Sequence, residues 1–323
     1  MTYQENYQKW LDFAELPAYL RDELVAMDEK TKEDAFYTNL EFGTAGMRGL
    51  IGAGTNRINI YVVRQATEGL AQLIDSKGEE AKKRGVAIAY DSRHFSPEFA
   101  FESAQVLAAH GITSYVFESL RPTPELSFAV RHLHTFAGIM VTASHNPAPF
   151  NGYKVYGEDG GQMPPADADA LTDYIRAIEN PFAVKLADLE ESKANGLIEV
   201  IGENVDAEYL KEVKGVNINQ DLINEYGRDM KIVYTPLHGT GEMLARRALA
   251  QAGFEAVQVV EAQAVPDPDF STVKSPNPEN QEAFALAEEL GRKEYADILA
   301  AIEPESERLG FDICQLHIAH LNL

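Results

Sequence analysis

Short apolar segments that alternate with helical segments of roughly 10 to 15 residues constrain the fold of this chain more than any other feature. Strand-like segments lie at Val86–Tyr90, Thr113–Phe117 and Thr135–Thr142. Helix-like segments separate them at Pro97–His110 and Pro124–His132. Strands that alternate with helices in this way predict an α/β fold with a mixed, mainly parallel sheet.

The same alternation resumes in the second part of the chain, and a length of 323 residues allows about two domains. We therefore predict two consecutive three-layer α/β domains, over residues 1–205 and 206–323. The later strands are predicted at Lys231–Leu237, Ala256–Val260 and Asp297–Ile302. The later helices are predicted from the turn His238–Gly241 to Ala252 and from Glu279 to about Arg292. The mixed, acidic stretch 180–202 is interpreted as a connector between the domains.

Three further segments carry local predictions. Residues 1–40 show apolar residues at helical spacing and are predicted to form amphipathic helices. The apolar, β-branched run Ile58–Val63 is interpreted as a strand that precedes a helix over Gln65–Ser76. Apolar and polar residues alternate over Phe311–Leu323, which favours an edge strand.

The composition excludes several classes of protein. The chain has 28 basic and 51 acidic side chains and a net charge of −23, so it repels phosphate backbones and anionic lipid, and neither nucleic acid nor a membrane is an expected partner. Cys314 is the single cysteine, which rules out an internal disulfide and fits a reducing compartment. The sequence has no secretory signal and no apolar run of the roughly 18 to 20 residues that cross a membrane. A cytoplasmic location is predicted.

The segment Val141-Thr-Ala-Ser-His-Asn-Pro147 holds the most informative candidate site. It follows a predicted strand, at the edge where parallel sheets place their ligands. Ser144 would be exposed there, and His145 could orient it or exchange protons with it. The alternative is an ordinary turn, because each of these residues suits one. No acidic residue lies close by in sequence, so a hydrolase triad is not supported.

Five motifs, in their order along the chain, resemble those of the α-D-phosphohexomutases, in particular the branch of phosphoglucomutases and phosphopentomutases. The segment Thr142–Pro147 is similar to the phosphoserine loop of that family. The others are Phe42-Gly-Thr-Ala-Gly-Met-Arg-Gly49, Asn151-Gly-Tyr-Lys154, Thr235-Pro-Leu-His-Gly-Thr-Gly241 and Lys274-Ser-Pro-Asn-Pro-Glu279. The resemblance covers residues 40 to 310 and implies that Ser144 carries a phosphoryl group between positions of a sugar phosphate through a bisphosphate intermediate.

The resemblance also implies roles for the surrounding residues. Arg48, His145 and Lys154 would assist Ser144 in catalysis, with Lys154 as a proton acceptor if neighbouring cations lower its pKa. The substrate-binding residues implied are Thr44, Arg48, Lys154 and Arg308. Glucose 1,6-bisphosphate would act as activator. The plainer alternatives are a surface charge for Arg48 and a solvated strand position for Lys154.

Arg93 and Ser96 belong to the stretch Asp91-Ser-Arg-His-Phe-Ser-Pro97, which follows a strand and opens a helix. The resemblance implies a mainly structural role for them around the site. From its position before Pro97, Ser96 is expected to cap the helix.

The chain departs from the family at the metal loop. The family carries three alternating aspartates there, whereas this chain reads Glu303-Pro-Glu-Ser-Glu-Arg308. Ser144, Glu303, Glu305 and Glu307 would be the ligands of Mg²⁺, which binds at about 2.0–2.1 Å. Because each glutamate is one methylene longer than aspartate, we expect the ion to be displaced, weakly held or absent. An acidic loop that caps a helix is the alternative.

The chain also departs from the family in length. Family members have four domains, and the resemblance covers only the first two, so domains III and IV are absent from this sequence. We therefore expect impaired turnover from the chain alone. Phosphopentomutase and phosphomannomutase activity stay open as alternatives, as does a non-catalytic sugar-phosphate binding module. The sequence gives no oligomeric state.

Overall fold

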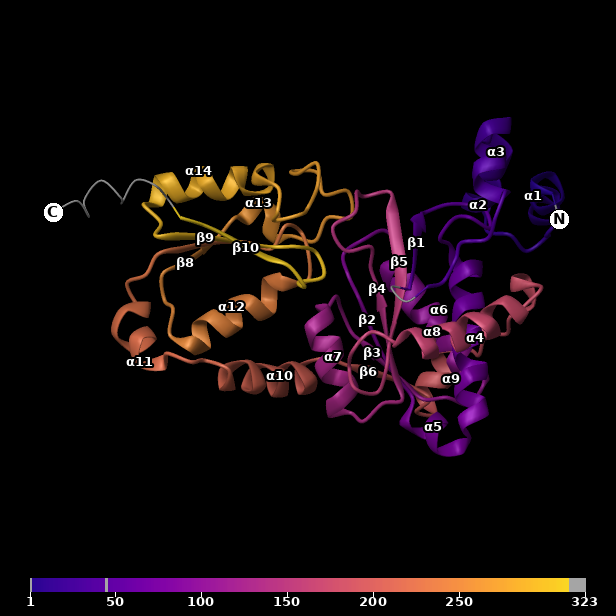
Figure 1. Ribbon diagram of the computed structural model, residues 1–323, viewed down its shortest axis with the longest axis horizontal. Coiled ribbons are helices and arrows are strands. Elements are labelled where there is room, and N and C mark those ends of the chain that lie inside the picture. The colour runs from indigo at the N-terminus through magenta and orange to yellow at the C-terminus, as the bar shows by residue number, and fades with distance from the viewer. Residues whose placement is uncertain (1, 44–45, 314–323) are drawn as a thin grey trace.

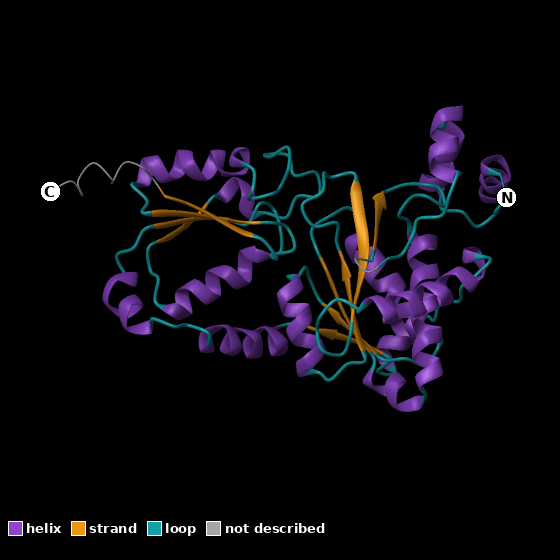
Figure 2. Ribbon diagram, in the orientation of Figure 1, coloured by secondary structure: helices purple, strands orange, loops and turns teal. Residues whose placement is uncertain are grey.

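The computed structural model describes residues 2–43 and 46–313 of the chain. These residues form two α/β units, each built around one β-sheet (Figures 1 and 2). The first sheet has six strands in the order β1-β5-β4-β2-β3-β6, and the second has four in the order β10-β9-β7-β8. Within the described residues, no helix is both long enough and apolar enough to cross a membrane.

The first sheet is mixed but mainly parallel, which confirms the predicted fold class. Strands β4, β2, β3 and β6 run parallel to one another, whereas β5 pairs antiparallel with β4 and with β1. The strands are β1 (Met47–Leu50), β2 (Val86–Tyr90), β3 (Ser114–Phe117), β4 (Ala137–Val141), β5 (Phe150–Tyr156) and β6 (Ile198–Ile201). Every residue of β2 and β4 is buried, because helices cover both faces of these central strands.

In the first unit α7 covers one face of the sheet, and α4, α6 and α8 lie on the other (Figure 1). The helices are α1 (Tyr3–Leu11), α2 (Ala18–Ala26), α3 (Glu29–Phe36), α4 (Ile60–Lys77), α5 (Glu79–Arg84), α6 (Ser96–Ala109), α7 (Thr123–His132), α8 (Pro165–Ala177), η1 (Pro181–Ala183) and α9 (Leu189–Ala194). The amphipathic helices predicted over residues 1–40 are confirmed as α1 to α3. Trp10 packs edge-on against Phe36 and Tyr61, so α1 and α3 share a core with α4.

The strand predicted at Ile58–Val63 is wrong, because α4 begins at Ile60. Asn59 caps this helix, and its side chain accepts hydrogen bonds from the backbone N–H groups of Tyr61 and Val62. From Ile60 on, the β-branched residues of this run are buried within the first turn of α4. A cap and a buried helix face therefore outweigh the intrinsic strand preference of these residues, which is a weak determinant.

The connector predicted over residues 180–202 is also wrong, because this stretch contributes η1, α9 and the edge strand β6. Strand β6 pairs in parallel with β3, with Ile198 opposite Ser114 and Ile201 opposite Phe117. Glu199 and Val200 are exposed between the two buried isoleucines. A four-residue edge strand with two exposed positions gives little periodic signal within an acidic sequence, which explains the error.

The second unit contains a parallel core, β9-β7-β8, with β10 added antiparallel to β9. Helices α12 and α14 lie on opposite sides of this sheet (Figure 1). The elements are α10 (Glu203–Gly215), α11 (Gln220–Leu222), η2 (Ile223–Gly227), β7 (Ile232–Thr235), α12 (Gly241–Ala252), β8 (Val257–Val259), α13 (Glu261–Ala264), η3 (Gln281–Phe284), α14 (Ala285–Glu294), β9 (Ile298–Ile302) and β10 (Leu309–Ile313).

Two predictions about this unit have a specific outcome. The domain boundary placed between residues 205 and 206 falls inside α10 and stays a prediction. The edge strand predicted over Phe311–Leu323 agrees with β10 as far as Ile313, and residues 314–323 lie outside the described part of the chain.

Candidate active site

The candidate site forms where loops from the two units meet. Ser144 follows β4 of the first sheet, and Glu303 follows β9 of the second. Each strand has one parallel neighbour, β2 for β4 and β7 for β9. The carboxyl ends of parallel strands are the usual place for ligand sites in α/β folds. The hydroxyl Oγ of Ser144 donates a hydrogen bond of 2.9 Å to Oε2 of Glu303. The phosphoserine motif and the acidic motif are thereby brought into direct contact, although 159 residues separate them.

The backbone of the serine loop holds Ser144 in an unusual conformation. Its φ angle of 56° lies in the left-handed region, which is uncommon for a residue other than glycine. The N–H of Ser144 donates to Oγ1 of Thr142 at 2.9 Å. His145 lies beside it, with Nδ1 at 3.1 Å from the Ser144 hydroxyl. The segment does form a turn, and within that turn the serine side chain faces the acidic loop. Ser144 is buried between the two loops, at 5% exposed, so the expectation that it would be exposed is wrong.

The acidic loop presents three carboxylates to one point. Glu303 and Glu305 are fully buried, Glu307 is partly exposed, and one oxygen from each lies within 4.8 Å of the others. Burial, and then the charge of Glu305, raise the pKa of Glu303 to about 7. Burial also raises the pKa of Glu307, with a further contribution from Glu305. The cluster is therefore costly to charge unless cations lie nearby.

Lys154 supplies one such cation. It extends from β5, is buried, and its Nζ lies 2.8 Å from both carboxylate oxygens of Glu305 and 3.5 Å from Glu307. Burial alone would raise the pKa of Glu305, but the Lys154 ammonium, together with hydrogen bonds from Ser144 and Thr123, lowers that pKa below its ordinary value. The solvated strand position considered for Lys154 is thus wrong. Its nearest charged neighbours are carboxylates, not the cations on which its proton-acceptor role was conditional.

Two arginines border the cluster. Arg48 lies on β1 opposite Gly152 of β5, is exposed, and donates to Oδ1 of Asn146 in the serine loop at 2.8 Å. Arg308 donates to Glu279 at 3.0 Å and is also partly exposed. Burial, followed by the charges of Arg308 and Arg48, lowers the pKa of His145. Thr44, the remaining predicted substrate residue, lies outside the described residues.

Thr123 is a contact that the sequence reasoning missed. Its Oγ1 donates to Oε2 of Glu305, and its N–H donates to the backbone carbonyl of Glu305, both at 2.9 Å. Thr123 begins α7, a few residues after the end of β3. The rule that directed attention to Ser144, a polar residue after a parallel strand, would also have selected Thr123.

The residues of the acidic loop suit a divalent cation of the Mg²⁺ class. Their donors are hard carboxylate oxygens, two of the three side chains are buried, and their spacing lets one ion approach all three. Ser144 Oγ lies within the same cluster through its bond to Glu303. The additional methylene of each glutamate therefore does not prevent the three carboxylates from converging.

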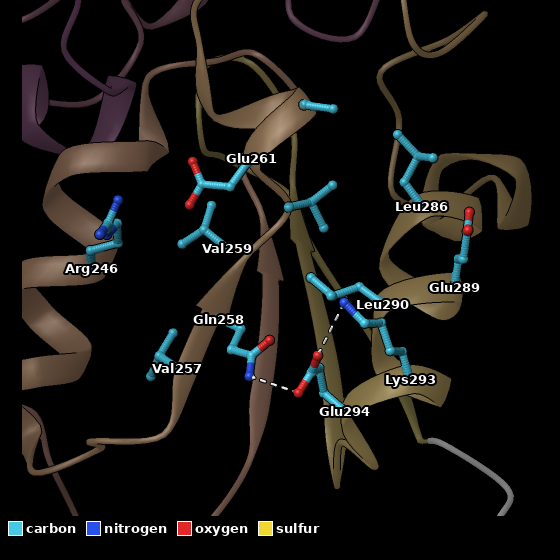
Figure 3. Close-up of a pocket in the computed structure, with 12 residues that line it drawn as sticks. Arg246, Val257, Gln258, Val259, Glu261, Leu286, Glu289, Leu290, Lys293 and Glu294 are labelled. Carbon is cyan, nitrogen blue, oxygen red and sulfur yellow. Dashed lines mark hydrogen bonds and ion pairs between the residues drawn. The ribbon is translucent and has the colours of Figure 1, made fainter.

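A separate groove lies on the second unit, between β8, α12 and α14 (Figure 3). Its walls are formed by apolar side chains such as Val257, Val259 and Leu290, and by a few exposed charged residues. Gln258 donates to Glu294 at 3.3 Å across it. The groove shares no residue with the cluster around Ser144.

Family models match most of the chain. The model described as phosphoglucomutase/phosphomannomutase α/β/α domain I matches residues 39–182, and the model of domain II matches residues 207–313. A phosphoglucomutase of Staphylococcus aureus is 40% identical over 288 residues, which are 88% of this chain and 50% of that protein. A phosphoglucomutase of Staphylococcus saprophyticus is 38% identical over 292 residues, with 90% and 51% covered. The chain thus spans about half the length of the curated relatives it matches.

Solved structures give the same fold. A phosphoglucomutase/phosphomannomutase family protein from Burkholderia thailandensis superposes with a TM-score of 0.65 at 20% identity. That superposition covers 86% of this chain and 55% of the Burkholderia chain.

Proposed function

The chain belongs to the phosphoglucomutase/phosphomannomutase family, whose domain I and domain II models it matches, and on that premise we propose that it carries the phosphoryl-carrier half of a phosphohexomutase. The observation that supports this most strongly is the contact of 2.9 Å between Ser144 Oγ and Glu303, which joins the candidate nucleophile to the candidate metal loop. Glucose phosphate is the proposed substrate, since the relatives that support the proposal are named phosphoglucomutases. Phosphopentose and phosphomannose remain alternatives.

In the proposed reaction, phosphorylated Ser144 gives its phosphoryl group to a free hydroxyl of a sugar monophosphate. The Oγ–phosphorus bond breaks, a bond from the sugar oxygen to phosphorus forms, and the hydroxyl proton passes to a base. The bisphosphate then returns its other phosphoryl group to Ser144. Such transfers depend on positioning and on stabilising the charge of the transferred group.

The residues around Ser144 have separate proposed roles. Arg48 is exposed beside the serine loop, where its guanidinium can hold a substrate phosphate. His145, in contact with the hydroxyl, is proposed to exchange the proton, and its lowered pKa keeps the imidazole neutral and able to accept it. Lys154 is proposed to offset the negative charge of the acidic loop and of the phosphoryl group. Thr44 and Arg308 stay proposed substrate contacts.

Glu303, Glu305 and Glu307, together with Ser144, would hold Mg²⁺. When bound, the ion would supply positive charge against the oxygens of the transferred phosphoryl group. Lys154 already pairs with Glu305, so the ammonium and the ion would share one set of carboxylates. For this reason we propose that Mg²⁺ is held weakly by this chain.

The test is the intact mass of the purified chain before and after incubation with glucose 1,6-bisphosphate and Mg²⁺, followed by peptide mapping. We expect a gain of one phosphoryl group on Ser144 and no gain in Ser144→Ala. We also expect the 323-residue chain alone to accept phosphate without sustained mutase turnover. If neither protein gains phosphate while the wild type binds glucose 1-phosphate saturably, the non-catalytic binding module is the correct description. Unchanged labelling in Ser144→Ala would show that a residue other than Ser144 carries the phosphoryl group.

A further inference from the structure

Arg93 lies beneath the serine loop, in a position that the sequence reasoning treated as structural. It follows β2 and is buried, with 1% of its surface exposed. Its Nε donates to Oδ2 of Asp91 at 3.1 Å, and its backbone N–H donates to Oδ1 of the same carboxylate at 2.9 Å. Asp91 also accepts from Thr142 at 2.7 Å and from Ser96 at 2.8 Å. Ser96 thus bonds to Asp91 and does not cap α6, contrary to expectation.

The two remaining guanidinium nitrogens bind the serine loop itself. Nη2 donates to the backbone carbonyls of Ser144 and Asn146, both at 2.6 Å. Nη1 donates to the carbonyls of Pro147 and Phe150, both at 3.0 Å. With Asp91, these four carbonyls use all five N–H donors of an arginine. A lysine has three donors and no planar fork, so it could not replace this set of contacts.

These contacts hold the stretch of backbone that orients the side chain of Ser144. With φ at 56°, Ser144 occupies the left-handed region, which is sterically unfavourable for a residue with a side chain. Such a conformation persists only where surrounding contacts enforce it. The carbonyl of Ser144 is held by Arg93 on one side, and its N–H is held by Thr142 on the other. The hydroxyl is then left facing Glu303.

Arg93 also touches the second unit. The ring of Phe270, in the loop between α13 and η3, lies 5.0 Å from the guanidinium carbon, within the range of a cation–π contact. Phe270 is buried, and its neighbour Asp269 pairs with His94 at 2.8 Å. The same arginine therefore contacts both the loop that carries the serine and the unit that carries the acidic loop.

We propose that Arg93 is a positioning residue for phosphoryl transfer: its guanidinium holds four carbonyls of the serine loop so that Ser144 stays in the left-handed conformation from which Oγ reaches the acidic loop. This proposal rests on the proposed function of Ser144 as phosphoryl carrier. Arg93 itself is buried and touches no reacting atom, so it acts only through the loop.

The experiment uses the full chain with Arg93→Ala, Arg93→Lys and, as matched control, Arg84→Ala. Arg84 also donates to two backbone carbonyls, those of His134 and Thr135, but at the opposite end of β2. We expect both Arg93 variants to lose at least tenfold in the initial rate of Ser144 labelling by glucose 1,6-bisphosphate, and Arg84→Ala to label like the wild type. Millimolar guanidinium should restore labelling of Arg93→Ala saturably, whereas an equal concentration of sodium chloride should not.

Hydrogen exchange gives a second readout that does not depend on labelling. In the Arg93 variants, amides of residues 142–150 should exchange at least tenfold faster, with little change in β2 and α6. A folded Arg93 variant with wild-type loop exchange would overturn the proposal, as would wild-type labelling that guanidinium does not alter. If the wild type itself takes no label, the proposed function fails, but loop exchange still decides the role of Arg93. If Arg93→Ala does not fold, Arg93→Lys provides both measurements.

Discussion

Lys154 is a buried cation that pairs directly with the acidic loop. Its Nζ contacts both oxygens of Glu305, and both side chains are buried. Removing one partner of a buried ion pair leaves an uncompensated charge and typically costs about 3–5 kcal/mol. We expect Lys154→Met to lower the free energy of unfolding by that amount in urea titrations without divalent ions.

Two variants test whether that loss comes from the pair. Lys154→Met combined with Glu305→Gln should recover much of the stability, because the fully buried carboxylate that Lys154 contacts at 2.8 Å is then neutral as well. Lys211→Met removes the exposed pair with Glu208 and should leave the free energy of unfolding almost unchanged, because water screens an exposed pair. Equal losses in the Lys154→Met and Lys211→Met variants would show that Lys154 has no special role in charge balance.

Magnesium should stabilise Lys154→Met and the wild type to different extents. An ion bound by Glu303, Glu305 and Glu307 replaces the positive charge that Lys154 provides in its absence. We therefore expect millimolar Mg²⁺ to raise the melting temperature of Lys154→Met more than that of the wild type. The measurement is thermal unfolding with and without Mg²⁺, with Glu303→Gln/Glu307→Gln as the variant that should not respond. The same shift in all three proteins would mean that the ion acts elsewhere.

Glu125 predicts a pH dependence of stability. It is fully buried on α7, its nearest cation is Arg121 at 3.7 Å, and burial, followed by the Asp206 carboxylate, raises its pKa to about 9. Between its ordinary value of 4.5 and this value, the folded chain binds the proton more tightly than the unfolded chain. Stability from this residue is therefore complete below pH 4.5 and falls as the pH rises toward 9.

Glu125→Gln isolates this contribution, because the amide stays neutral. One pKa unit corresponds to about 1.4 kcal/mol, so between pH 6 and 8 the wild type should lose up to about 3 kcal/mol more than Glu125→Gln. The measurement is urea unfolding at several pH values. Parallel pH profiles for the two proteins would show that Glu125 ionises without a penalty.

Single residues were predictable from the sequence only where a motif carried them. Ser144, His145, Lys154 and Glu303 were selected by motif and do lie together in the structure. Thr123 was missed because it belongs to none of the five motifs, although it follows β3 as Ser144 follows β4. The role of Arg93 was missed for a related reason, since its fit beneath four carbonyls follows from the path of the loop and not from sequence spacing.

At the scale of elements, the start of α4 depends on Asn59. Its side-chain oxygen caps Tyr61 and Val62, and its amide nitrogen donates to the carbonyls of Gly52 and Gly54, each at 2.9 Å. Loss of a helix cap costs about 0.5–2 kcal/mol, and two buried carbonyls would also lose their donor. We expect Asn59→Ala to destabilise the chain by about 2–3 kcal/mol in urea titrations.

Asn180→Ala is the control, because Asn180 caps the short, exposed η1 through one bond of 3.3 Å to Phe182. Its loss should cost less than about 1 kcal/mol. If Asn59→Ala and Asn180→Ala lower the free energy of unfolding equally, the additional contacts of Asn59 do not contribute to the stability of α4.

Elements with strong periodicity were predicted well, and edge elements were not. The buried strands β2 and β4 and the helices α6 and α7 agree with their predicted ranges within a few residues. Strand β6 forms because it can pair with the edge of β3. The residue types at positions 198–201 do not show that such an edge is available. The start of α4 is set by the Asn59 cap. Strand and helix propensities of single residues do not take such a cap into account.

At the scale of the whole molecule, the site depends on how the two units meet. Contacts between them join Thr123 to Glu305, Ser144 to Glu303 and His94 to Asp269. The sequence predicts each unit from its own alternation of strands and helices. It carries no comparable signal for their relative placement, which is set by these polar contacts and by Phe270 against Arg93. The motifs alone therefore predicted Ser144, Lys154 and Glu303, but neither Thr123 nor the geometry that joins them.

The edge of the second sheet predicts association of the chain in solution. Leu309, Phe311 and Ile313 alternate along β10, so they share one face, and they are 53%, 61% and 64% exposed. Apolar side chains grouped on an edge strand favour pairing with another chain. A net charge of −23 opposes this at low salt. The balance should shift with ionic strength, because the Debye length falls from about 30 Å at 0.01 M to about 3 Å at 1 M.

We expect the weight-average mass from sedimentation or light scattering to rise with protein concentration, and to rise more steeply as salt screens the charge. Phe311→Ser should weaken association at least tenfold, because it removes the central side chain of the face. Ile218→Ser is the control, since Ile218 is 93% exposed but lies in the turn between α10 and α11, away from that sheet edge. Equal weakening by both variants would indicate general hydrophobic attraction, and a monomer at every salt concentration would show that charge repulsion dominates.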